Sequence, residues 1–243
     1  MRIHHALPLA LLLAAAPAGA QIGPDVVTLP PEEAFAAVER ILLEEEHLAA
    51  DEVELRADSA LTVRLMGGLR LGPGNRARLH ADGLFEVDAR LRLVSDGTRM
   101  VGGRSAEVGF DEPTAPALRE ALAIGFTRMG LLHNVARLFT GAAPDHAGGG
   151  VTEWVEVHGF EWLPEQAVSG HATRPLRFTV RVDGTDTAEA ELFLHKATGL
   201  PLLRRQRVTF ATGRMIVEEY YSGWLNTPPS EEAVFAVEPS PFE

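Results

Sequence analysis

The C-terminal third of the chain alternates between apolar and polar residues with a period of two. Residues 176–182 alternate in this way, and residues 188–195 repeat the pattern after a glycine. Because side chains alternate across a strand, both runs predict strands with one buried face. Runs 203–210 and 215–221 follow segments rich in turn-forming residues. The region therefore predicts an antiparallel meander, whose first strand directs inward Leu176, Phe178, Val180 and Val182.

A second set of strands is predicted between residues 53 and 103. The clearest alternation begins at Phe85 and continues through Leu93, with charged residues at the intervening positions. Gly and Pro clusters at residues 72–75, and Asp96 followed by Gly97, predict turns. The first half of the chain therefore predicts a meander of its own.

Two segments have helical spacing instead. From Pro31 to about Ala50, apolar residues recur every three or four positions opposite an acidic face, which predicts an amphipathic helix. Residues 118–139 carry a much wider apolar stripe, so this helical segment must be buried or must cover an apolar surface. Gly125 and Gly130 interrupt it, and they mark either a break into two shorter helices or a close approach of backbone; a role as hinges stays open.

The order helix, strands, helices, strands predicts an α+β fold, and we expect residues 21–243 to form a single domain. Residues 1–20 have the features of a secretory signal: Arg2, an apolar core at residues 7–16 and the ending Ala18-Gly19-Ala20. The apolar core is too short to span a membrane, which requires roughly 20 residues. We therefore expect an exported, periplasmic protein.

Charge and cysteine content narrow the possible partners. The chain has 22 Lys and Arg residues against 34 Asp and Glu residues, a net charge of −12. Bulk electrostatics therefore disfavours nucleic acid and anionic lipid headgroups as partners. There is no cysteine, so no disulfide can form and stability must come from an ordinary core.

The chain has no recognisable catalytic or metal-binding motif. His133, His146, His158 and His171 are 12 or 13 residues apart, whereas zinc sites usually contain histidines separated by three to five residues. No Gly-x-Ser-x-Gly nucleophile motif is present. We therefore predict no catalytic residues, no metal, no cofactor and no enzymatic activity.

The end of the chain resembles a known family. Residues 191–204, which include the turn Thr198-Gly199-Leu200-Pro201, together with residues 218–224 and 228–239, resemble the closing hairpins of LolA/LolB-like periplasmic lipoprotein carriers. The resemblance covers about the last fifty residues. It implies an incomplete β-barrel of curved antiparallel sheet, covered by an N-terminal helix and a helical lid at residues 118–139 above an apolar cavity. The resemblance does not assign the carriers' functional arginine to any one position of this chain. The carriers' specific activity is therefore not inferred for this chain.

Two functions remain in competition. The first is a soluble carrier or sensor that binds a lipid, a lipoprotein acyl chain or another hydrophobic ligand between the sheet and the lid. The second is an envelope interaction protein with a filled core, which would meet its partner through a sheet edge or through residues 224–242; a hydrolase is a third and weaker possibility. A cavity on the order of several hundred Å³ under the lid would favour the carrier. The side chains predicted to line that cavity are Leu122, Phe126, Met129, Leu132, Phe178, Val180, Leu192 and Leu194.

Overall fold

The computed structural model describes residues 23–58, 62–144, 150, 154–210, 213–225 and 232–237. The predicted signal, residues 1–20, lies outside them. Within the described ranges the helices are η1 (Pro24–Thr28), α1 (Pro31–Glu44), α2 (Leu118–Ala123), η2 (Ile124–Phe126), α3 (Leu131–Phe139) and η3 (Glu232–Phe235). The strands are β1 (Leu48–Asp58), β2 (Val63–Gly72), β3 (Arg76–Phe85), β4 (Val87–Asp96), β5 (Arg99–Arg104), β6 (Glu107–Pro113), β7 (Val155–Trp162), β8 (Gln166–Val168), β9 (His171–Val182), β10 (Thr185–His195), β11 (Pro201–Phe210) and β12 (Gly213–Leu225).

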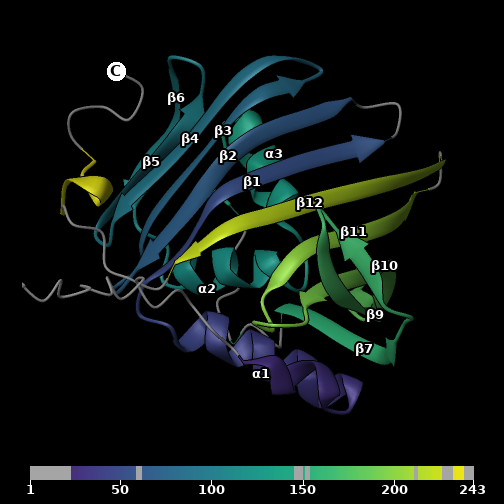
Figure 1. Cartoon of the computed structure of the whole chain (residues 1–243). Coiled ribbons are helices and arrows are strands. Elements are labelled where there is room, and N and C mark those ends of the chain that lie inside the picture. The colour runs from purple at the N-terminus through teal and green to yellow at the C-terminus, as the bar shows by residue number, and fades with distance from the viewer. Residues whose placement is uncertain are drawn as a thin grey trace, which may run out of the picture.

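These strands form one antiparallel sheet in which two meanders lie side by side (Figure 1). The strand order is β6-β5-β4-β3-β2-β1-β12-β11-β10-β9-β7, with β8 paired to β9. The two meanders meet where β1 pairs with β12, from Ala49 opposite Leu225 to Asp58 opposite Ile216. The path of paired strands ends at β6 and β7 without closing. The predicted α+β fold with an incomplete β-barrel is therefore confirmed.

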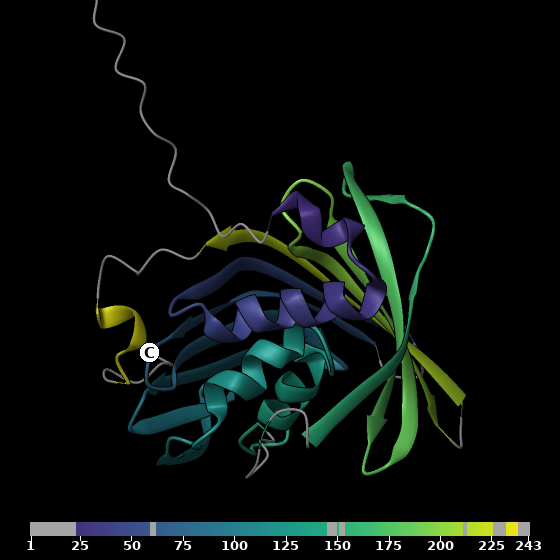
Figure 2. The same cartoon turned by 90° about the horizontal axis from the view of Figure 1, so that it is seen from below.

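The helices lie on the concave side of this curved sheet (Figure 2). Helix α1 packs against β7, α2 against β2 and β3, and α3 against β4, β5 and β12. Pro31 begins α1, where the missing N–H costs no hydrogen bond, and Glu32 and Glu33 follow in the first turn. Within the described ranges, no helix is both long and apolar enough to cross a membrane.

Helix α1 is held against the second meander by aromatic contacts. Phe35 lies 5.0 Å from Phe178 of β9 and 5.0 Å from Phe160 of β7, measured between ring centroids. The indole N–H of Trp162 donates to the carbonyl oxygen of Leu29 at 2.9 Å. Edge-to-face and tilted ring pairs at such distances add to the stabilisation from buried area.

The polar residues of the second meander form ion pairs across its outer, convex face. Arg177 lies 3.6 Å from Glu161 and 3.8 Å from Glu191, and Arg205 lies 3.3 Å from Glu191 and 2.8 Å from Glu218. The pairs run from β7 through β9, β10 and β11 to β12. The predicted alternation is therefore confirmed in β9, where Leu176, Phe178 and Val180 point into the main core. The exceptions are Phe193 and Leu203, which form a small apolar cluster with Val168 apart from that core, and Arg204 and Glu219, which are buried.

Several predicted boundaries are wrong. Helix α1 ends at Glu44, because residues 48–50 pair with β2 and β12 instead of continuing the helix. Phe85 belongs to β3, and Glu86, at φ 60°, turns the chain before β4 begins. The apolar segment 118–139 is not one helix: α2 and η2 end before Gly130, whose φ is 86°. Of the two alternatives left open for the glycines, the break into shorter helices is thus found.

Beyond β12, the described residues 232–237 lie on the outer face of the first meander. Trp224 still belongs to β12: its ring lies 4.9 Å from that of Phe126, and its indole N–H donates to the carbonyl oxygen of Pro201 at 2.8 Å. Phe235 is buried beside Gly72, and Val237 is buried against Val94 and Val101. These described residues of the tail are therefore engaged by the sheet itself.

The interior contact between α1 and β9 gives a test of this packing. Replacing Phe178, which is fully buried, by Ala should lower the free energy of unfolding by about 3–5 kcal/mol, since it removes a core ring and leaves a cavity. Thr179→Ala, on the opposite face of the same strand, should cost less than about 1 kcal/mol. Urea unfolding of both variants measures the difference, and equal losses would contradict the assignment of faces.

Candidate functional site: the helical cover of the concave face

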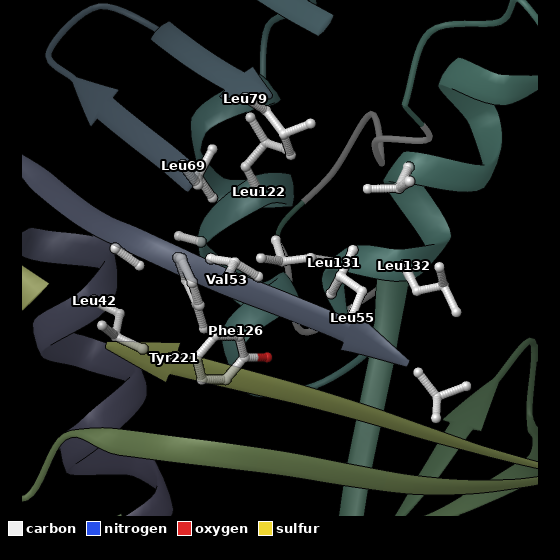
Figure 3. Close-up of a cluster of buried hydrophobic side chains, with 14 of the residues drawn as sticks. Leu42, Val53, Leu55, Leu69, Leu79, Leu122, Phe126, Leu131, Leu132 and Tyr221 are labelled. Carbon is white, nitrogen blue, oxygen red and sulfur yellow. The ribbon is translucent and has the colours of Figure 1, made fainter. Parts of the chain in front are cut away.

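The candidate site is the segment from α2 to α3, which covers the apolar face of the sheet. Figure 3 shows side chains of this cover directed toward those of the first meander. From the cover these are Leu122, Phe126, Leu131 and Leu132. From the sheet they are Val53, Leu55, Leu69 and Leu79. All of them are buried members of one hydrophobic cluster.

The structure places the eight predicted lining residues in this same cluster, but not all beneath the same helix. Leu122, Phe126 and Leu132 lie in the cover and are buried, and Met129 is partly buried beside them. The four residues from β9 and β10 are also buried, and one of them, Phe178, packs on α1. The list from sequence omits the sheet residues under α2 and α3, because these helices face mainly the first meander and β12.

Among the residues that the structure describes, little space is left between α3 and strands β1, β2 and β3. A gap of about 10 Å³ remains there, lined among others by Val53, Leu69, Leu131 and Val135. A cavity needs roughly 10–15 Å³ to hold a single water molecule. The gap is therefore far too small for an acyl chain.

A buried polar joint fixes the turn between η2 and α3. The guanidinium of Arg204, from β11, donates to the carbonyl oxygens of Thr127 at 3.1 Å and Arg128 at 2.5 Å. The carboxylate of Glu219, from β12, accepts the backbone N–H of Leu132 at 2.8 Å. Glu219 therefore caps the first turn of α3, where a helix has unsatisfied N–H groups and favours negative charge.

Burial has a strong effect on the ionisable groups of this joint. It lowers the pKa of Arg204, and the nearby carboxylate of Glu219 partly offsets this effect. Tyr221 donates its hydroxyl to Glu219 at 2.7 Å, and burial, together with that negative charge, raises the pKa of Tyr221 well above its usual range. Tyr221 therefore stays protonated, and it remains a donor to the carboxylate.

A buried ion pair connects the same turn to α1. The guanidinium of Arg128 contacts Glu39 at 2.5 Å and also donates to the carbonyl oxygen of Val155 at 2.5 Å. Arg119, in α2, is bonded to the carbonyl oxygens of Leu43 and Glu45 at the end of α1. The cover is thus fixed to α1 as well as to the sheet.

Two residues of the cover have buried side-chain atoms without a hydrogen-bond partner among the described residues: Oε2 of Glu120 and both polar atoms of Asn134. Asn134, in α3, is fully buried, and neither its side-chain oxygen nor its nitrogen has a hydrogen-bond partner among the described residues. A buried polar group without a partner costs about 1–3 kcal/mol. Asn134 therefore makes the closed position of α3 less stable than an apolar residue would.

Sequence reasoning missed the joint, although part of it was visible. In β12 the apolar positions Val217 and Tyr221 lie on the inner face, and alternation places Glu219 between them on that face. Glu219 lies opposite Arg204 in the register of β11 and β12. The available signal was Glu219, a charged residue at an inward position of its strand. The pairing of β11 with β12 would then have directed attention to Arg204.

The described residues contain no group of three or more histidine, aspartate or glutamate side chains arranged to hold a metal ion. His158 instead contacts Asp186 at 3.0 Å, and His171 lies against His195 with ring centroids 5.2 Å apart. His146 lies outside the described residues.

No protein family model and no curated protein matches the chain. Among solved structures it is similar to the lipoprotein LppX from Mycobacterium tuberculosis, with 9% identity over 86% of this chain and 99% of that one, at a TM-score of 0.44. LprF from Mycobacterium bovis has 10% identity over 86% of this chain and 97% of that one, at a TM-score of 0.43. A LolA superfamily protein from Nitrosomonas europaea has 9% identity, with coverages of 86% and 98%, at a TM-score of 0.35.

Gly130 tests whether the joint is as close-packed as its geometry indicates. A Cβ added at Gly130 would lie 2.8 Å from both Arg204 Nη1 and Glu219 Oε1. Gly130→Ala should therefore lower the free energy of unfolding by more than the roughly 1–3 kcal/mol expected from an unfavourable positive φ alone. Thermal and urea unfolding measure the loss.

Gly23 provides the matched control. Its φ of 104° and ψ of 151° are close to the 86° and 147° of Gly130, and an added Cβ would meet nothing within 4 Å. Gly23→Ala should therefore show the backbone strain without the clash. If the two variants lose the same stability, the joint is looser than described.

Proposed function

We propose that this chain is an exported, non-enzymatic carrier or sensor that binds a lipid, a lipoprotein acyl chain or another hydrophobic molecule under the cover. The observation that carries the proposal is the buried joint, together with the unsatisfied Asn134. An apolar cover is held in place by a few directional polar bonds, and it contains a group that destabilises the closed position. Such a cover is suited to opening as a unit.

Opening would create the binding surface from residues that are now in mutual contact. Displacement of α3 would expose Leu132 and Val135 on the cover, and Leu55 and Leu69 on the sheet. The ligand-lining set expected from sequence, including Leu122, belongs to the same cluster. The sheet would remain as the fixed wall, because its strands are paired along their length.

The energetics of such an exchange are balanced. Burial of an acyl chain contributes about 0.8 kcal/mol per CH₂, so a chain of roughly 12 carbons gains on the order of 10 kcal/mol. Breaking the hydrogen bonds of Arg204 and Glu219 costs about 1.5–3 kcal/mol for each bond to a charged group. The ligand would also replace part of the apolar contact that α3 loses, so the exchange requires no large change in net stability.

A second function is favoured by the filled interior. A remaining gap of about 10 Å³ is what a protein with a permanently packed core would have. In that case the chain would act as an envelope interaction protein, and its partner would pair with the mostly exposed edge strand β6. Ligand binding decides between the two functions.

The decisive measurement is binding of a long acyl chain by the purified protein. Native mass spectrometry should detect a bound lipid, and after delipidation the protein should bind a fluorescent fatty acid and gain thermal stability from it. Absence of both the bound lipid and the thermal shift would favour the interaction protein.

Asn134→Leu tests whether α3 is the moving part. Removal of the unsatisfied amide should raise the free energy of unfolding by about 1–3 kcal/mol. Because only the closed state contains this buried amide, the same change should weaken fatty acid binding by roughly 5- to 150-fold. Asn134→Ala, which removes the amide without adding bulk, controls for overpacking. A stabilised variant with unchanged binding would show that α3 does not move.

A further inference from the structure

The outer face of the first meander carries a concentration of positive charge that the function above does not use. Arg70 of β2 and Arg78 of β3 are directly opposite one another in register. Like charges at such positions destabilise a sheet unless something offsets them. Arg70 is paired with Asp51 at 3.0 Å, whereas Arg78 donates to the carbonyl oxygen of Val234 at 3.2 Å and has no carboxylate partner among the described residues.

The two arginines border a pocket. Its volume is about 310 Å³, at the lower end of the range for small-molecule sites, and its walls include Asp51, Gly68, Arg70, Arg78, His80 and Val234. Gly68 keeps the pocket open, because an added Cβ would lie 2.9 Å from the carbonyl oxygen of Asp51 and 3.0 Å from the His80 ring. Neighbouring strands and the C-terminal segment therefore enclose a space with cationic side chains on its walls.

The electrostatics of His80 agree with this geometry. Partial burial lowers the pKa of its imidazole, and the charges of Arg92, Arg78 and Arg70 lower it further, while Asp82 opposes them. Arg92, opposite His80 on β4, is paired with Asp82 at 2.8 Å. Three guanidinium groups thus act on one imidazole, in a chain whose net charge is −12. A positive pocket on an acidic protein focuses anions at that position.

We propose that this pocket binds a phosphate group. Arg78 supplies a guanidinium without a carboxylate partner, whose planar fork suits two oxygens of a tetrahedral anion. Arg70 supplies a second positive charge and is oriented by Asp51. The single negative charge of Asp51 does not cancel the two arginines, so the pocket has a net positive charge. His80 adds a further donor. The phosphate belongs either to a free anion or to a lipid headgroup, and the pocket lies on the opposite side of the sheet from the helical cover.

The first test uses the full chain and inorganic phosphate in isothermal titration calorimetry. Arg78→Gln should weaken binding by about tenfold or more, because it removes a charged donor. Arg90→Gln is the matched control: Arg90 lies on the same outer face, opposite Asp82, and is not part of the pocket wall. It should leave binding unchanged. Circular dichroism melting verifies that both variants are folded.

A second arm distinguishes the source of the phosphate. Vesicles of phosphatidylcholine with 30% phosphatidylglycerol, compared with phosphatidylcholine alone, are sedimented with the wild type and both variants. Binding of free phosphate without vesicle binding identifies a soluble anion. Vesicle binding that is lost in Arg78→Gln but kept in Arg90→Gln identifies a lipid headgroup. If neither probe binds, or if both variants weaken binding equally, the proposal is wrong.

His80 predicts the pH dependence of the site. A bound anion favours the charged imidazole and so raises its pKa, which means that binding takes up a proton and strengthens as the pH falls. Sulfate keeps its charge between pH 5.5 and pH 8 and is the suitable probe. Its affinity should rise severalfold toward pH 5.5 in the wild type and stay constant in His80→Gln. An equal rise in both would exclude His80 from the pocket.

Discussion

The structure depends on the buried polar joint between the sheet and its helical cover. Apolar packing has no direction, so a smooth apolar face would allow α2 and α3 to settle in many positions. Arg204 and Glu219 remove that freedom, because their hydrogen bonds to Thr127 and Leu132 form only when the turn before α3 lies in one position. Leaving a buried polar group without its hydrogen bond costs about 1–3 kcal/mol, and more where the group is charged. Shifted positions of the cover are therefore much less stable.

The same joint explains why a short turn carries so much of the fold. Arg128 contacts Glu39 of α1 and the carbonyl oxygen of Val155 at the start of β7. The turn thus connects the first helix, the middle helices and the second meander. Gly130 allows this convergence, since any side chain there would occupy the space between Arg204 and Glu219. The backbone freedom of Gly130 and the polar contacts from distant strands are therefore both needed to hold this turn in place.

Much of the sheet could be predicted from sequence, because a strand with one buried face shows alternating apolar and polar residues along its own length. The runs containing Phe178 and Leu192 became β9 and β10 with their apolar members inside. The pairing of β1 with β12 could not be predicted, since it joins segments far apart in the chain and depends on how the two meanders meet. The end of α1 was wrong for the same reason, because pairing of residues 48–50 overrode a local helical pattern.

The candidate site was predicted less well than the fold. The apolar character of residues 118–139 identified the cover, but periodicity gave no information about which part of the sheet lay beneath it. The charged members of the joint were missed because Arg204 occupies an inward position in a run whose apolar residues are few. Hydrophobic pattern identifies a surface that must be covered. It does not identify the polar contacts that select one cover from many.

The gap on the inner face and the pocket on the outer face meet at Gly68 of β2. The small gap under α3 and the outer pocket both include Gly68 and His80 in their walls, so only one thickness of backbone separates them. A Cβ at Gly67 would lie 1.8 Å from the carbonyl oxygen of His80, which requires glycine there. The strands are therefore close and bare of side chains at this point. Different chemistry on the two faces follows from what surrounds them: leucines from α3 inside, and arginines from β2 and β3 outside.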